Sequence, residues 1–191
     1  YRQGISESWC AIDKRRLTRG QRIELARQIM AATAEREAVQ RRQWAANAER
    51  NAELWGNCVP LVPGDPASLY LQRRLQQRNQ PATLLIQGIN SLPTEVLRLH
   101  PALPYWHERE MLGTFPAMVA PLTAPDGRIV ALHRTYLNMD GGKAEVPTVK
   151  KLTAAAGPLA GACIPLHRPA SSIGIAEGIE TALAAWLAWR V

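Results

Sequence analysis

The sequence predicts an α/β (α+β) protein, because helical and strand patterns both occur and lie in separate parts of the chain. A segment rich in Ala, Arg, Glu and Gln predicts one long helix over residues 19–54. Two apolar runs flanking a short turn sequence predict a β-hairpin over residues 116–137. A short apolar run over 172–176 precedes a helical pattern over 179–189, which predicts one βα unit.

The long helix has a clear start. Thr18 and Gln21 have the spacing of a capping box, in which each side chain bonds the other residue's backbone. Its apolar stripe then thins into alanines, so its second half has little to bury. Such a helix can be a solvated connector or can contact a partner, and the pattern leaves both open.

Shorter elements follow a proline-rich loop over residues 58–66. Asp65 and Pro66 predict the start of a helix through residues 67–78, with Asp65 as N-cap and Pro66 at the first helical position. A second short helix is predicted over 94–99, ending before Pro101. The hairpin then turns at Ala124-Pro125-Asp126-Gly127 and leads into a polar loop over 138–151. These strands predict a mixed sheet.

The positive charge is concentrated near the start of the chain. Residues 14–50 hold ten of the 23 basic residues and four of the 16 acidic ones, so they carry most of the net charge of +7. An anionic partner is therefore favoured along this helix. Its candidate DNA-binding residues are Arg36, Arg41 and Arg42.

Several classes of protein are disfavoured. The chain has no apolar run near the ~20 residues of a membrane helix. Its three cysteines form no CxxC pair, and its histidines have no ligand-like spacing, which argues against a zinc site or a disulfide framework. A reduced, cytoplasmic setting is expected.

The strongest chemical signal is Glu177. It follows the predicted strand and precedes Gly178, which permits a tight turn into the next helix. A carboxylate at the carboxyl end of a central strand lies where α/β sheets bind ligands. An ordinary loop glutamate would give the same local pattern, so the wider context decides.

That context is a resemblance to a known family. The segment GIAEGIETALAA (174–185) resembles the first motif of the Toprim fold. Three earlier segments resemble the polymerase core of bacterial replicative primases, in the same order: LYLQRRL (69–75), the hairpin ending in HRTYL (133–137), and VPTVKK (146–151). The similarity is greatest to primases of phages, plasmids and integrative elements, and it covers nearly the whole chain. Leu75 departs from the pattern, which has Gly at this position.

The resemblance implies a DNA primase that makes short RNA primers on single-stranded DNA from ribonucleoside triphosphates by two-metal nucleotidyl transfer. Glu177 would be its catalytic glutamate and one ligand of Mg²⁺ or Mn²⁺. The basic residues that would bind nucleotide or template are Arg134, Lys143, Lys150 and Lys151. The implied protein partner is a replicative helicase, fused or separate. The resemblance implies no interaction with a membrane. A Toprim nuclease or topoisomerase and a non-catalytic nucleic-acid-binding module remain as alternatives.

The same resemblance divides the chain into four parts: a basic helical arm (1–54), a small helical segment (55–112), a primase-core hairpin region (113–168) and an incomplete Toprim start (169–191). Both ends are expected to be internal to a longer protein, with the remaining acidic metal ligands beyond residue 191. The chain alone is then expected to be inactive and to bind no metal. Lys150 and Lys151 are both expected at the surface, because they follow a polar loop.

Overall fold

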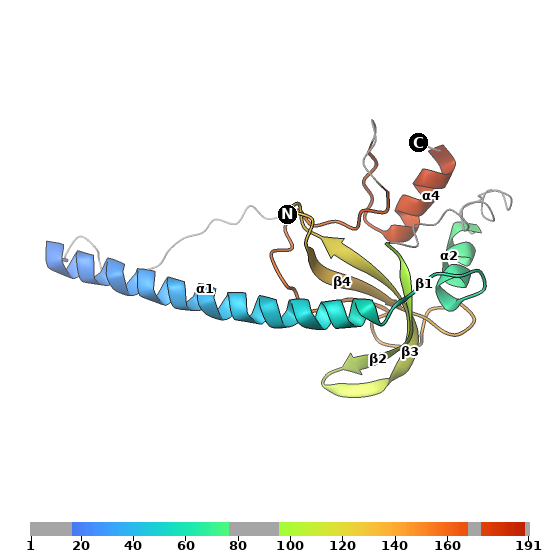
Figure 1. The fold of residues 1–191 in the computed structure, drawn as a ribbon, viewed down its shortest axis with the longest axis horizontal. Coiled ribbons are helices and arrows are strands. Elements are labelled where there is room, and N and C mark those ends of the chain that lie inside the picture. Colours follow the sequence, from blue (N-terminus) through green and yellow to red (C-terminus); the bar gives the residue numbers. More distant parts are fainter. Residues whose placement is uncertain (1–16, 77–95, 168–172, 190–191) are drawn as a thin grey trace. The chain divides into compact units, whose positions relative to one another are not determined.

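The computed structural model describes residues 17–76, 96–167 and 173–189 (Figure 1). The elements in chain order are α1 (Arg19–Gly56), β1 (Val59–Pro60), α2 (Pro66–Gln76), β2 (Arg98–His107), β3 (Glu110–Thr123), β4 (Ile129–Tyr136), β5 (Lys150–Leu152) and α4 (Ile179–Trp189). The predicted α/β class is confirmed. Two compact units divide between Gln43 and Trp44, within the length of α1. No helix of the described residues combines the length and apolar character needed to cross a membrane.

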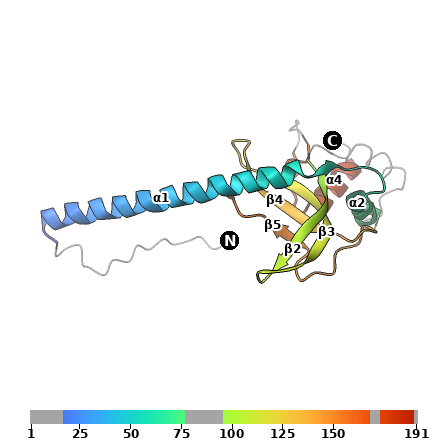
Figure 2. The ribbon, with the colours of Figure 1, turned by 60° about the horizontal axis from the view of Figure 1, so that its bottom comes forward.

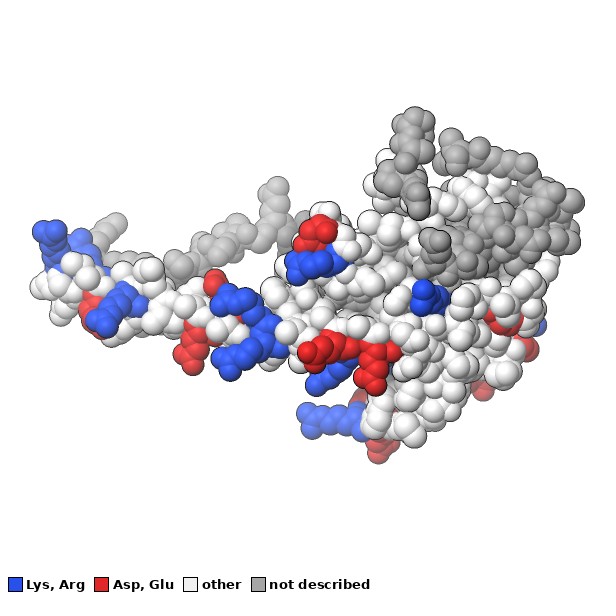
Figure 3. All heavy atoms as spheres, in the orientation of Figure 1, with Lys and Arg blue, Asp and Glu red and all other residues white. Residues whose placement is uncertain are grey.

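The first unit contains the beginning of α1. The predicted capping box forms: the Thr18 amide donates to Gln21 Oε1 over 2.9 Å, and the Gln21 amide donates to Thr18 Oγ1 over 3.3 Å. Acidic and basic side chains both occur along this helix (Figure 3), and exposed pairs such as Arg41–Glu37 neutralise part of the basic charge locally. The candidate DNA contacts Arg36, Arg41 and Arg42 are all exposed.

The second unit is built on a five-stranded sheet in the order β1-β2-β3-β4-β5 (Figure 2). Each neighbouring pair is antiparallel, so the described sheet is an antiparallel meander rather than a mixed sheet. The predicted hairpin is confirmed as β3 and β4. Its turn closes with the Gly127 amide donating to the Ala124 carbonyl, and Gly127 has a φ of 84°, which favours glycine.

Two local predictions are wrong. Residues 98 and 99 belong to β2, so the helix predicted over 94–99 does not form there; residues 94–95 lie outside the described part. Pairing with β3 overrides the helical pattern, and β2 accommodates Pro101 at a register shift between His100 and Leu103. Residues 173–176 are exposed and irregular rather than a buried strand, with Ile175 93% exposed. A strand needs a neighbour to satisfy its backbone, and no described strand pairs with this segment.

The predicted domain boundaries differ from the compact units. One unit begins at Trp44, inside the predicted arm, and β3 continues through the predicted boundary between residues 112 and 113. The polar loop predicted over 138–151 ends in β5, a strand that its lysines did not suggest.

Each face of the sheet has its own apolar core. One core joins α2 and α4 to the sheet through residues such as Leu71, Met118 and Leu183. The other core contains Tyr105, Leu132 and Tyr136, with Leu54 and Trp55 from the end of α1 packed against it. The sheet is therefore covered by helices on both sides (Figure 2).

Helix α2 begins as predicted. Asp65 Oδ1 accepts a hydrogen bond from the Ser68 amide over 2.6 Å, and Asp65 Oδ2 accepts one from the Val62 amide over 2.7 Å. The helix continues through Leu75, where the primase pattern has glycine. Leu75 is 1% exposed and packs in the core with α4, so its side chain contributes to stability here.

Candidate functional site around strand β5

The central feature of the site is the short strand β5. Lys150 lies opposite Thr135 of β4, and Lys151 lies opposite Arg134. Successive side chains of a strand point to opposite faces of the sheet, and residues directly opposite each other share a face. The two neighbouring lysines therefore serve different faces: Lys150 lies on the side of α2 and α4, and Lys151 lies on the side of α1.

On the first face, the exposed Lys150 bonds into a polar cluster whose other two members, Tyr70 and Glu180, are buried. Its Nζ donates to Glu180 Oε1 over 2.7 Å, and the Tyr70 hydroxyl donates to the same oxygen over 2.5 Å. The Glu180 side chain is 7% exposed, whereas that of Lys150 is 40% exposed. These three residues, called here the Glu180 cluster, join α2, β5 and the first turn of α4.

The Glu180 cluster is electrostatically satisfied. Burial by itself would raise the pKa of Glu180, but the hydrogen bonds from Lys150 and Tyr70 outweigh it and lower that pKa to about 2. Burial, together with the hydrogen bond to the Glu180 carboxylate, raises the pKa of Tyr70 well above its ordinary value. Glu180 is therefore a carboxylate and Tyr70 a neutral hydroxyl at neutral pH. Lys150 is exposed, as the sequence predicted, and its ammonium group also bonds Glu180.

His133 of β4 lies close enough to the Glu180 cluster for the charges of that cluster to affect its pKa. Burial, and next the positive charge of Lys150, lower the pKa of His133 below its ordinary value. Its Nδ1 is buried without a hydrogen-bond partner in the described structure. The lowered pKa keeps His133 neutral at pH 7, as a half-buried neighbour of the Glu180 cluster.

On the opposite face of the sheet, Lys151 and Arg134 place two positively charged side chains next to each other. Lys151 Nζ donates to the Trp106 carbonyl over 2.5 Å and lies 3.9 Å from the centre of the Tyr105 ring. Arg134 donates from Nη2 to the Leu152 carbonyl over 2.9 Å and from Nη1 to the Tyr136 hydroxyl over 3.3 Å. These contacts hold both cationic groups while leaving donors for an anion.

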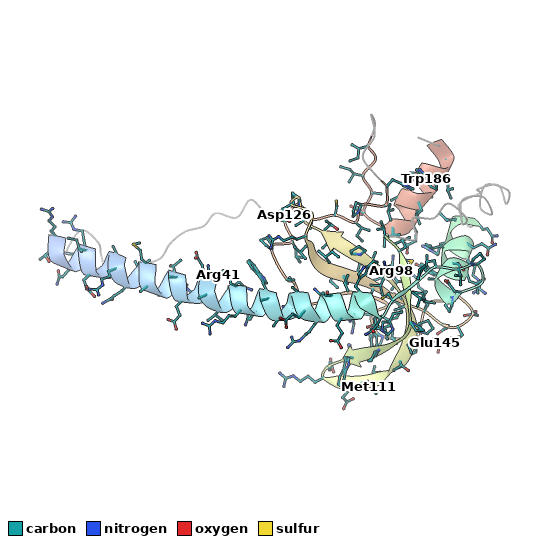
Figure 4. The ribbon with its side chains drawn as sticks, viewed as in Figure 1. Arg41, Arg98, Met111, Asp126, Glu145 and Trp186 are labelled. Carbon is teal, nitrogen blue, oxygen red and sulfur yellow. The ribbon has the colours of Figure 1, made fainter. Side chains whose placement is uncertain are left out.

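Arg98 adds a third cation to this face. Arg98 belongs to β2 and is labelled in Figure 4. Its guanidinium lies 4.4 Å from the centre of the ring of Trp55, at the end of α1. A guanidinium over an aromatic ring is stabilised by the ring's negative face. Sequence analysis did not select Arg98, because its role depends on the pairing of β2 with β3.

The remaining predicted residues lie apart from these contacts. Glu177 is exposed and lies two residues before α4, three residues before the buried Glu180. Lys143 is exposed in a loop that approaches α2 at Gly141, where an added Cβ would lie 2.5 Å from Leu69 Cβ. Across the described ranges, no three His, Cys, Asp or Glu side chains gather as a metal site.

Sequence reasoning missed Tyr70 and Glu180, although one signal for Glu180 was present. It is the acidic residue of the first turn of an otherwise apolar helix, and it shares a stripe with Leu183, Ala184 and Leu187 at spacings of three, four and seven. A carboxylate on a buried stripe needs a partner, because burying an unpaired charge is costly. The sequence did not indicate which partner that would be.

Residues 45–164 match the model of a family described as a domain of unknown function, DUF7146. Neither a curated protein nor a solved structure matches the chain. The match begins one residue after the start of the second compact unit and contains all five strands, Arg134 and both lysines of β5, but neither Glu177 nor Glu180. Because the match spans more than half of the chain, the protein belongs to the DUF7146 family.

Proposed function

We propose that this chain is part of a Toprim-type DNA primase, of the kind found in phages, plasmids and integrative elements. The observation that carries the proposal is the convergence of three segments at β5. Lys151 lies beside Arg134 of the HRTYL segment, and Lys150 bonds Glu180 of the EGIETALAA segment. The HRTYL and VPTVKK segments meet as the neighbouring strands β4 and β5, and the EGIETALAA segment follows further along the chain. Each resembles the corresponding part of a primase.

The proposed reaction is attack by a primer 3′-hydroxyl on the α-phosphate of a ribonucleoside triphosphate, with pyrophosphate as the leaving group. Lys151 and Arg134 would bind the phosphates of nucleotide or template, since their ammonium and guanidinium groups match anionic oxygens. Lys143 would contact the same strand from its exposed loop. Lys150 has a different task, because its charge already stabilises Glu180.

The divalent metal of this proposal would be Mg²⁺ or Mn²⁺, which stabilises the attacking and leaving oxygens when bound. Exposed Glu177 can supply one carboxylate ligand. The described residues contain no group of three acidic, His or Cys side chains that could complete the site, so no step is assigned to the metal.

The proposed partners are single-stranded DNA, ribonucleoside triphosphates and a replicative helicase, fused or separate, in a cytoplasmic setting. The exposed residues Arg36, Arg41 and Arg42 of α1 would contact the DNA backbone. Exposed arginines of this kind contribute affinity that falls as salt is raised, because bound phosphates release counterions.

The test is primer synthesis by the full-length protein on single-stranded DNA with ribonucleoside triphosphates. Wild type should make template-dependent primers, and Lys151→Ala should make them about tenfold more slowly, the effect of losing one charged hydrogen bond to phosphate. Arg128→Ala is the matched control. It removes one charge from the exposed turn between β3 and β4, where Arg128 pairs with Asp126, and should leave the rate unchanged.

The outcome separates the proposal from its alternatives. A wild-type protein that binds single-stranded DNA but makes no primers is a binding module. One that cleaves or relaxes DNA instead is a Toprim nuclease or topoisomerase. Either result rejects the primase assignment, and equal rates for Lys151→Ala and Arg128→Ala would reject the role of Lys151.

A further inference from the structure

A second feature of the α1 face is a pocket of about 190 Å³ between the end of α1, strand β4 and the segment that follows β5. Helix α1 contributes Asn47, Arg50, Asn51 and Leu54, and the sheet side contributes Arg134 and residues 153–154. The four α1 residues recur at spacings of three and four, so they lie on one side of the helix. All of these residues belong to the second compact unit.

Two asparagines fix the geometry of this pocket. Asn47 Nδ2 donates to the Ala155 carbonyl over 2.8 Å, and Asn51 Nδ2 donates to the Ala154 carbonyl over 3.3 Å. Asn51 is 5% exposed. These bonds hold α1 against the segment that follows β5. They also give a hydrogen-bond donor to the carbonyls of Ala154 and Ala155, two residues that lie outside the strands of the described sheet. The walls of the pocket are therefore set by the fold before any ligand binds.

The charges that line the pocket have one sign. Arg50 and Arg134 are its two ionic groups, and no carboxylate is among the described lining residues. Arg50 is exposed, and its Nη1 makes one long contact, 3.4 Å, with Asn47 Oδ1. Arg134 contributes an Nε that is buried without a hydrogen-bond partner in the described structure. An anion in the pocket would balance the charge of both guanidiniums and would accept from the Nη hydrogens that the protein bonds leave over.

The size of the pocket narrows the class of ligand. Sites for whole small molecules commonly measure about 300–1,000 Å³, so this pocket fits one group of a larger ligand. A tetrahedral phosphate matches both the size and the forked donors of two arginines.

We infer that this pocket binds a phosphate group, with Arg50 as the residue that reaches it from solvent. The ligand is either the phosphate of a nucleotide or one phosphodiester of single-stranded DNA. The choice of these ligands rests on the proposed function, while the pocket and its charge do not.

The experiment uses the whole 191-residue chain and two probes, ATP and a single-stranded oligo-dT. Arg50→Ala should weaken binding of at least one probe about five- to tenfold. If the ligand is DNA, the slope of log affinity against log salt concentration should also become shallower, by about the amount that one phosphate contact contributes. Arg50→Lys, which keeps the charge but not the fork, should restore part of the loss. Arg128→Ala, with the same loss of charge at an exposed turn, should bind both probes as wild type does.

Each outcome has one meaning. Loss for ATP alone identifies a nucleotide phosphate, and loss for the oligonucleotide alone identifies a backbone phosphate. Arg50→Ala binding both probes like Arg128→Ala would overturn the inference, as would a wild-type chain that binds neither probe. Phosphate binding that depends on Arg50 in a protein that makes no primers would leave the inference standing and reject the primase assignment.

Discussion

Replacing Glu177 by glutamine in the full-length protein is expected to reduce primer synthesis at least about 100-fold. In the proposed function Glu177 would hold a metal ion, and the amide keeps the size of the side chain but removes the negative charge for that role. The side chain is exposed, so the substitution should leave the free energy of unfolding within about 0.5 kcal/mol of wild type. Rates of primer synthesis and thermal unfolding of the same preparations measure both.

The control for this prediction is DNA binding. Glu177→Gln should bind single-stranded DNA as tightly as wild type, because Arg134 and Lys151 lie on β4 and β5 and do not depend on Glu177. Primer synthesis by Glu177→Gln at a near wild-type rate would show that Glu177 takes no part in the reaction, and would contradict the Toprim assignment.

The second large effect concerns the Glu180 cluster. Glu180→Ala should lower the free energy of unfolding by about 2–3 kcal/mol, because the buried Tyr70 hydroxyl loses its acceptor and the ion pair with Lys150 is lost. The value lies below that of a fully buried ion pair, since water reaches Lys150 and screens the interaction. Glu180→Asp keeps the charge but shortens the reach, and should retain part of the stability.

The same cluster predicts a dependence on pH. The folded-state pKa of Glu180, about 2, lies below its ordinary value of 4.5. Its stabilising contribution is therefore complete above about pH 4.5 and is lost as the pH falls toward 2, by at most about 3 kcal/mol. Glu180→Gln should remove this part of the acid dependence. The lowered pKa of His133 adds a further loss of stability, which begins as the pH falls below its ordinary 6.5.

Urea unfolding of wild type and Glu180→Gln across pH 2 to 7 would measure that difference. The two curves should converge as the pH approaches 2 and stay separated above pH 5. Parallel curves throughout would mean that Glu180 does not titrate in this window, and would contradict the ion pair as described.

Local signals in the sequence were sufficient for several elements. The capping box at Thr18, the N-cap at Asp65 and the turn at Gly127 each lie where their residue types predict. These features depend on bonds between residues a few positions apart, so the local sequence contains the information. Helix α4 was predicted over the same residues for a similar reason, a sustained apolar helical pattern.

The features that failed depend on distant partners. Residues 98–99 form part of β2 because β3 pairs with them, and residues 173–176 are not a strand because no described strand does. The site shows the same limit: sequence proximity grouped Lys150 with Lys151, whereas alternation along β5 places them on opposite faces, and the register with β4 decides which lysine faces α4. The local pattern contains no information about that register, so the structural role of Lys150 and its bond to Glu180 could not be predicted.

The central claim is that Lys150 stabilises the fold whereas Lys151 is available to bind a ligand. It is tested most directly by comparing the free energies of unfolding of Lys150→Ala and Lys151→Ala in urea at pH 7. Lys150→Ala should cost about 2 kcal/mol, because it leaves the Glu180 carboxylate buried with Tyr70 as its remaining side-chain donor among the contacts described. Lys151→Ala should cost no more than about 1 kcal/mol, the value of a partly exposed cation over an aromatic ring. Equal losses, or a larger loss for Lys151→Ala, would contradict the assignment of Lys150 to the fold and Lys151 to the ligand.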